Sequence, residues 1–148
     1  MQIRELGHVV LYVSDLGKLA DFYGRTLGFR EIVREWPMAA FSSGRTHHEL
    51  LLIEVGGVSD HPRGRPQTPG LYHIGFKVAD DDAELKSVLQ ELRDAGVPIM
   101  GTTNHGVTHS IYILDPDGNE LELYADVSDR WKQDPKSIAA PARRLNLE

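Results

Sequence analysis

Two segments of this 148-residue chain repeat one another, and the repeat constrains the fold more than any other feature. The segment 8–15 reads HVVLYVSD, and the segment 73–80 reads HIGFKVAD. In each, a histidine is followed five residues later by valine and seven residues later by aspartate. Each segment is rich in strand-forming residues and leads into a helical pattern. The chain is therefore predicted to hold two copies of one structural unit.

The first copy, about residues 4–55, is predicted to form a strand, a helix and three more strands. Leu6–Val13 is rich in β-branched residues, which favours a strand. Asp15 is suited to cap the helix that follows, and Gly28 is suited to end it. The three further strands are predicted at Arg30–Glu35, Met38–Ser43 and His48–Val55.

The second copy, about residues 71–126, repeats this order. Its predicted elements are a strand at Leu71–Val78, a helix at Asp81–Ala95, and strands near Ile99, at Ser110–Leu114 and at Glu120–Tyr124. Glycine and proline in the stretch 56–70 predict a loop between the copies. The polar segment 127–148 is predicted to be a C-terminal tail, packed on the surface or partly disordered.

The fold class that follows is α+β, with two βαβββ modules in one domain over residues 1–126. Each module alone exposes one face of its sheet, so pairing the modules would bury both faces. Two curled sheets that face one another would leave a concave space suited to a site.

Composition excludes several classes of function. The formal net charge of −6 opposes nucleic-acid binding and attachment to an anionic membrane surface. The sequence shows neither a signal peptide nor an apolar stretch long enough to span a bilayer, so a cytoplasmic protein is expected. Because the chain has no cysteine, a metal would have to be held by imidazole and carboxylate.

His8 and His73 occupy the same place in the two copies. If a pseudo-twofold axis relates the copies, the two imidazoles converge near that axis. Imidazole is the commonest metal ligand, so the pair favours a metal site. The alternative is two core histidines, each bound to a backbone carbonyl.

A carboxylate for the same site is predicted after the turn Asp115-Pro116-Asp117-Gly118. Alternation along the next strand places Glu120, Glu122 and Tyr124 on one face. That face is either solvated or turned toward the two histidines. Two histidines and one carboxylate form the set that suits non-haem Fe(II), although Mn(II) or Zn(II) also fits.

Three motifs resemble the signature segments of the vicinal oxygen chelate superfamily, which includes glyoxalase I, antibiotic-resistance proteins and extradiol catechol dioxygenases. They are Gly7-His8-Val9, Tyr72-His73-Ile74, and Asp115–Asn119 with Glu122. The resemblance covers about residues 4–126. It implies that the metal ligands are His8, His73 and Glu122.

Three further segments resemble the type I extradiol branch: 47–50 (HHEL), 105–108 (HGVT) and 110–112 (SIY). The resemblance implies a catalytic role for His48, His105 and Tyr112. The implied reaction is ring cleavage of a catechol-type aromatic diol by O2 with Fe(II), as in aromatic catabolism. His48 would transfer protons, while His105 and Tyr112 would position the substrate and stabilise negative charge. From the residues alone, the two histidines also fit a surface or loop position, and the tyrosine fits a strand core.

The resemblance leaves other members of the superfamily open. In glyoxalase I a fourth ligand, here Glu54 or Glu49, would join a Zn(II) or Ni(II) site. A metal-free antibiotic-binding protein and an epimerase-type enzyme are further alternatives. The family also suggests a homodimer or a larger homo-oligomer, with Trp36 or Trp131 as candidate interface residues.

Overall fold

The computed structural model describes residues 6–56, 71 and 73–147. The chain divides into two compact units. The first unit comprises Met1–Arg65 with Pro116–Gly118, and the second comprises Pro66–Asp115 with Asn119–Glu148. The loop predicted over 56–70 lies, apart from its first residue, outside the described residues.

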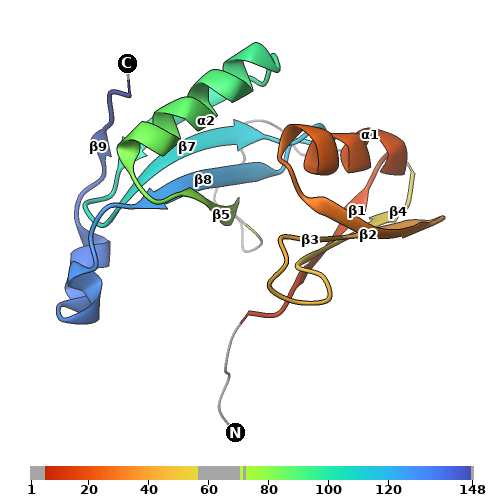
Figure 1. The fold of residues 1–148 in the computed structure, drawn as a ribbon, viewed down its shortest axis with the longest axis horizontal. Helices are drawn as coiled ribbons and strands as arrows, with labels where there is room; N and C mark the ends of the chain where they lie inside the picture. The colour runs from red at the N-terminus through yellow and green to blue at the C-terminus, as the bar shows by residue number, and fades with distance from the viewer. Residues whose placement is uncertain (1–5, 57–70, 72, 148) are drawn as a thin grey trace, which may run out of the picture. The chain divides into compact units, whose positions relative to one another are not determined.

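The first unit has a four-stranded sheet in the order β1-β4-β3-β2. Strands β1 and β4 are parallel, and the other neighbours are antiparallel. Its elements are β1 (Val9–Val13), α1 (Leu16–Asp21), the π-helical turn η1 (Phe22–Thr26), β2 (Arg30–Glu35), β3 (Met38–Ser42) and β4 (Leu50–Glu54). Helix α1 lies along one face of this sheet (Figure 1).

The ends of the first helical segment follow the predicted capping pattern. The Asp15 carboxylate accepts a hydrogen bond from the Lys18 N–H at 2.9 Å, which satisfies a donor that the helix leaves unpaired. Gly28 has φ +76°, so it ends the segment in a conformation that costs glycine little. The turn η1 was not predicted, because a π-helical turn has no distinct periodicity in so short a segment.

The second unit has a five-stranded sheet in the order β5-β8-β7-β6-β9. Strands β5 and β8 are parallel, and the other neighbours are antiparallel. Its elements are β5 (His73–Ala79), α2 (Asp82–Asp94), β6 (Ile99–Asn104), β7 (Thr108–Leu114), β8 (Glu120–Asp126), the 3-10 turns η2 (Arg130–Lys132) and η3 (Pro135–Ala139), and β9 (Arg143–Arg144).

The two faces of the second sheet differ in character. Helix α2 lies over one face (Figure 1), where its buried Leu85, Leu89 and Leu92 form a core with apolar residues of β7 and β8. The residues of β8 alternate, so that Leu121 and Leu123 are buried and Glu120, Glu122 and Tyr124 are half-buried. The alternation predicted from the sequence is therefore confirmed, and the polar side chains lie on the face away from α2.

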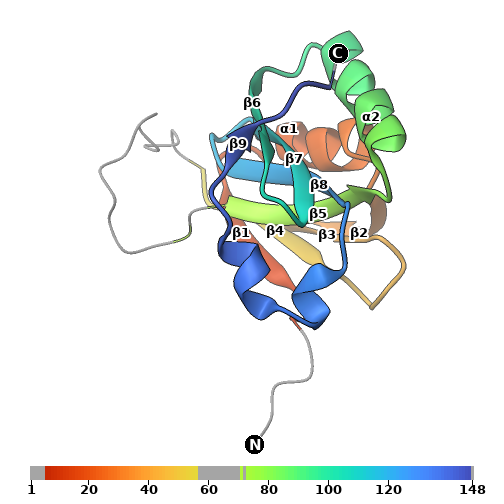
Figure 2. The same cartoon turned by 90° about the vertical axis from the view of Figure 1, so that its left-hand side faces the viewer.

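The tail holds more structure than its composition indicates. Strand β9 pairs with β6 (Figure 2), and Leu145 and Leu147 are buried. Because the tail completes the sheet edge and contributes two core side chains, it packs as part of the second unit.

The predicted α+β class with two βαβββ modules is confirmed. Boundaries shift by a few residues: the first strand begins at Val9 rather than Leu6, and the fourth begins at Leu50 rather than His48. In the part of the chain that the structure describes, no helix is long and apolar enough to cross a membrane.

Candidate functional site

His73 and Glu122 come together on the open face of the second sheet. His73 begins β5, and Glu122 lies on the neighbouring β8, opposite Gly75. The His73 Nε2 atom is 3.1 Å from one Glu122 oxygen, and its Nδ1 atom is 3.6 Å from the Glu120 carboxylate. The absence of a side chain at Gly75 leaves the space beside the Glu122 carboxylate open, since a Cβ there would lie 3.6 Å from Glu122 Oε2.

Ser110 holds the other oxygen of Glu122. Its hydroxyl, which is fully buried on β7, donates a hydrogen bond of 2.6 Å to Glu122 Oε1. This leaves Oε2 on the side of His73. The sequence prediction missed Ser110, although alternation from Tyr112 places this polar residue on the same strand face. A small polar residue two positions before a predicted site residue was the available signal.

His105 and Tyr112 form a second pair beside the carboxylate. The His105 Nε2 atom is hydrogen-bonded to the Tyr112 hydroxyl at 2.8 Å. Tyr112 stands opposite Glu122 in the antiparallel register of β7 and β8, and His105 Nε2 is 3.9 Å from Glu122 Oε1. An imidazole and a phenol thus lie next to the candidate ligands, on the same sheet face.

A tight turn presents His105. The His105 N–H donates to the carbonyl of Thr108 at 2.9 Å, and the Gly106 N–H donates to the Asn104 side chain at 2.7 Å. Gly106 has φ +85°, a conformation that glycine adopts without strain. The turn places the imidazole at the end of β6, which agrees with the loop position considered from the sequence, and the role of His105 in a site stays a prediction.

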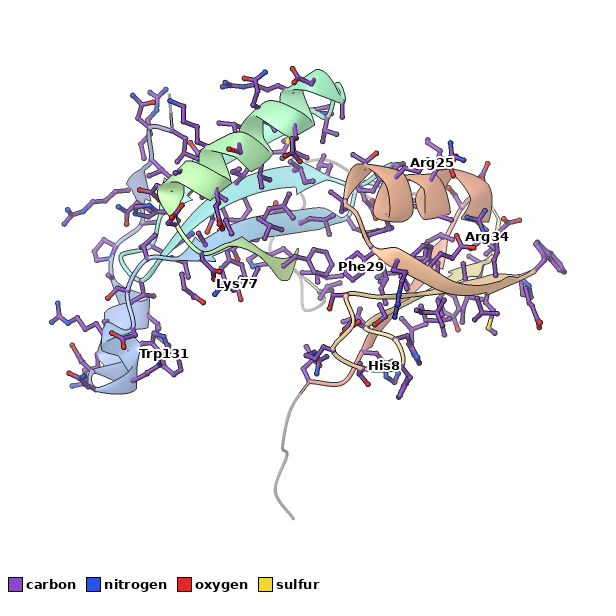
Figure 3. The ribbon with its side chains drawn as sticks, viewed as in Figure 1. His8, Arg25, Phe29, Arg34, Lys77 and Trp131 are labelled. Atoms are coloured by element: carbon purple, nitrogen blue, oxygen red, sulfur yellow. The ribbon has the colours of Figure 1, made fainter. Side chains whose placement is uncertain are left out.

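The first unit brings three histidines together at one end of its sheet. His8 lies just before β1 (Figure 3), and its ring centroid is 4.6 Å from that of His48 and 6.3 Å from that of His47. The Nδ1 atoms of His47 and His48 are 2.6 Å apart, which is a hydrogen bond between the two rings. Partial burial lowers the pKa of His48, and the neighbouring His47 and His8 lower it further.

The two glutamates considered as a fourth metal ligand have other partners. Glu54 accepts a hydrogen bond from the Leu16 N–H at 2.7 Å, at the first turn of α1. Glu49 accepts from the N–H groups of Ser43 at 2.9 Å and of Thr46 at 3.2 Å. Both carboxylates therefore take part in holding the fold of the first unit.

The predicted site residues thus form two groups. His73, His105, Tyr112 and Glu122 gather in the second unit, and His8 and His48 gather in the first. Among the described residues, no three or more His, Asp or Glu side chains are arranged to hold a metal ion. The joint ligand set of His8, His73 and Glu122 stays a prediction. Its donor types fit a divalent metal, and two of its members already face one another.

Tyr124 adds a group of high pKa to the open face. Burial raises the pKa of Tyr124, and the negative charges of Asp126 and Glu122 raise it further. The phenol therefore stays neutral near neutral pH.

Comparison with known families gives one match to a family model. The model of the Glyoxalase/Bleomycin resistance protein/Dioxygenase superfamily matches residues 5–123. Among solved structures, lactoylglutathione lyase from Agrobacterium tumefaciens aligns with a TM-score of 0.65 at 24% identity, covering 84% of this chain and 96% of that one. At that identity the structural likeness supports the fold.

Curated relatives include different reactions at similar identity. Biphenyl-2,3-diol 1,2-dioxygenase 3 of Rhodococcus globerulus is 33% identical over 82% of this chain and 63% of its own length. Catechol-2,3-dioxygenase of Bacillus subtilis is 30% identical over 87% of this chain and 44% of its own length. Glutathione transferase FosA of Serratia marcescens is 33% identical over 82% of this chain and 81% of its own length. The chain thus spans 44 to 63% of the length of these two dioxygenases.

Proposed function

This chain belongs to the glyoxalase/bleomycin resistance protein/dioxygenase superfamily, and on that basis we propose that it is a metal-dependent extradiol dioxygenase. Its substrates would be a catechol-type aromatic diol and O2, as the names of the two dioxygenases with which it shares 30 to 33% identity suggest. Fe(II) is the metal that this proposal favours.

One observation carries the proposal: His105 and Tyr112 are hydrogen-bonded to each other directly beside the Glu122–His73 pair. A site that only binds a metal needs no such pair. A site that handles a substrate with developing negative charge does need donors held next to the ligands.

His8, His73 and Glu122 would hold the metal. Two imidazoles and one carboxylate leave coordination positions for other molecules, which is the arrangement that non-haem Fe(II) oxygenases use. When bound, Fe(II) supplies the electron-transfer chemistry by which O2 reacts with the diol. The Ser110 hydroxyl fixes one Glu122 oxygen and leaves the other to face the His73 imidazole.

His48 would act on the protons of the diol. Because the pKa of His48 is lowered, its imidazole is neutral at neutral pH and able to accept a proton from a hydroxyl of the substrate. It lies against His8, so a candidate ligand and a candidate base come from one end of the first sheet.

His105 and Tyr112 would bind and stabilise oxygen atoms of the reacting molecules. The Tyr112 hydroxyl and the His105 Nε2 atom share one hydrogen bond, which fixes the direction of both groups before a substrate arrives. Donors fixed in advance need not reorganise as charge develops, and this makes them effective in a site that excludes water.

The test is an assay of the anaerobically purified chain, reconstituted with Fe(II) and mixed with catechols in air. We expect O2 uptake and a yellow ring-opened product. His48→Ala is expected to keep metal affinity and lower kcat by about 10²–10⁴-fold, the range for a lost acid-base group. An Fe(II)-loaded protein that consumes no O2 with any catechol would contradict the proposal.

A glyoxalase-type reaction is the second candidate, because the superfamily to which the chain belongs also includes glyoxalases. That reaction would require Glu54 or Glu49 as a fourth ligand. The bond from the Leu16 N–H to Glu54 instead predicts that Glu54→Gln keeps its metal affinity and loses at most about 1 kcal/mol of stability. Metal titration with a thermal melt checks this, and a large loss of metal affinity would favour the second candidate.

The assembly and the cellular location stay proposals alongside the reaction. We expect a homodimer or a larger homo-oligomer in the cytoplasm. Sedimentation of the purified chain checks the first expectation, and cell fractionation checks the second.

A further inference from the structure

We propose that His47 is a positioning residue, which holds the ring of His48 in one orientation and one tautomer. The inference rests on the proposed role of His48 in proton transfer. It adds a residue that the sequence motifs did not single out. The geometry behind it is the hydrogen bond of 2.6 Å between the two Nδ1 atoms.

The loop before β4 is built to bring these consecutive rings together. Consecutive residues of an extended strand point to opposite sides. Here His47 and His48 lie before β4 begins, and their ring centroids are 4.5 Å apart.

Three hydrogen bonds hold the two ends of this loop. The Ser42 hydroxyl donates to the Thr46 carbonyl at 2.7 Å, the Thr46 N–H donates to the Glu49 carboxylate at 3.2 Å, and the Glu49 N–H donates to the Phe41 carbonyl at 3.0 Å. Both histidines lie between these anchors, so their backbone is fixed from either side.

The hydrogen bond requires a defined tautomer of each ring. Between two neutral imidazoles, one Nδ1 donates and the other accepts. If His48 Nδ1–H donates to His47, the Nε2 atom of His48 carries a lone pair and is the atom that accepts a proton. A catalytic imidazole held in its working tautomer through Nδ1 is a recurring arrangement, in which the partner positions the ring without touching the substrate.

His47 is the group suited to this task among the near neighbours of His48. His8 is the other imidazole beside it, at a ring distance of 4.6 Å, and it is the proposed metal ligand. A metal ligand uses its nitrogen lone pair for the metal, so it cannot also accept the Nδ1 proton of His48 with that atom.

The decisive experiment compares His47→Ala with His47→Asn in the full-length chain. Asparagine places an acceptor oxygen two bonds from Cβ, where histidine places Nδ1, so it can still receive the His48 Nδ1–H. With and without Zn(II), the ¹⁵N shifts of the His48 ring are read from long-range proton–nitrogen spectra, and His48→Ala provides the assignment. We expect the Nδ1–H tautomer in the unmodified chain and in His47→Asn, and a mixture of tautomers in His47→Ala.

The kinetic arm uses the Fe(II)-loaded chain with a catechol. His47→Ala is expected to lower kcat by about 10–100-fold with KM nearly unchanged, and His47→Asn is expected to recover most of that loss. Unchanged His48 tautomers in His47→Ala overturn the inference, and so does an asparagine variant that is no better than alanine. The spectra decide on His47 even if no catechol is cleaved, so failure of the proposed reaction and failure of this inference are distinguishable.

Discussion

Removing the Ser110 hydroxyl is expected to weaken metal binding without removing a metal ligand. The hydroxyl donates at 2.6 Å to Glu122 Oε1 from a fully buried position. In Ser110→Ala this oxygen loses the donor at 2.6 Å, while the His105 Nε2 atom stands 3.9 Å away. The carboxylate is then free to rotate away from the orientation that faces His73.

Two estimates of the size of the effect agree. A hydrogen bond to a charged group contributes about 1.5–3 kcal/mol. At about 1.4 kcal/mol for each tenfold change, that is roughly a 10–100-fold change in an equilibrium constant. Loss of a residue that orients a metal ligand lowers metal affinity by about 10–100-fold in other sites. Ser110→Ala is therefore expected to raise the Kd for the metal by about one to two powers of ten.

The assay is an anaerobic competition titration of Zn(II) or Fe(II) against a chromophoric chelator, with a thermal melt of the metal-free chain alongside. Ser110→Thr is the matched control. Threonine keeps the hydroxyl but adds a methyl group to a filled space, at a cost of about 1–3 kcal/mol in folding stability.

The pattern across the two variants decides the matter. We expect both substitutions to lower the melting temperature, while only the alanine variant loses metal affinity. The positioning argument is refuted if both variants lose metal affinity in step with their loss of melting temperature. It is also refuted if Ser110→Ala binds metal as tightly as the unmodified chain.

Two further predictions concern stability. Asp117→Ala is expected to lower the free energy of unfolding in urea by about 1–3 kcal/mol, because its carboxylate accepts from the N–H of Ser14 at 2.8 Å and from the Ser14 hydroxyl. Because the pKa of Tyr124 is raised in the folded chain, its phenol loses the proton at a lower pH in the unfolded chain than in the folded one. The free energy of unfolding therefore falls as the pH rises past about 10. Between pH 9 and 11 the melting temperature of Tyr124→Phe should fall less than that of the unmodified chain. Identical pH profiles of the melting temperature for the two proteins would contradict this.

The elements of the fold were predictable because local chemistry determines them. Asp15 caps the first helical segment and Gly28 ends it with positive φ, as expected, and in the second helix Asp81 is the cap and Gly96 follows the end with positive φ. The alternation along β8 also predicted correctly which of its residues share a sheet face. Each of these features depends on residues within a few positions of one another, which a sequence displays directly.

The tail and the turn η1 were not predictable in this way. Strand β9 is two residues long and exists because Arg143 and Arg144 meet the edge of β6, a contact across about 40 positions of the chain. Burial of Leu145 and Leu147 depends on the same contact. A polar composition gave no indication of it, since long-range pairing leaves no periodic pattern in a segment this short.

Within the candidate site, resemblance to a family predicted residues by their motifs, and it gave no prediction for the hydrogen-bond partners of those residues. His105, Tyr112 and Glu122 lie close to one another, and their roles stay predictions. Ser110 is hydrogen-bonded to Glu122, and His47 is hydrogen-bonded to His48. Such partners depend on strand register and loop shape, so they become visible only when the backbone is in place.

The division of the second sheet into a helix-covered face and an open polar face has a consequence for how such a chain changes over generations. Packing against α2 constrains only the apolar face. Half-buried residues of the polar face such as Tyr112 and Glu122 can therefore be replaced together with limited damage to the core. A scaffold of this kind separates the demands of folding from those of chemistry, so that new reactions can arise on it while the architecture is inherited unchanged.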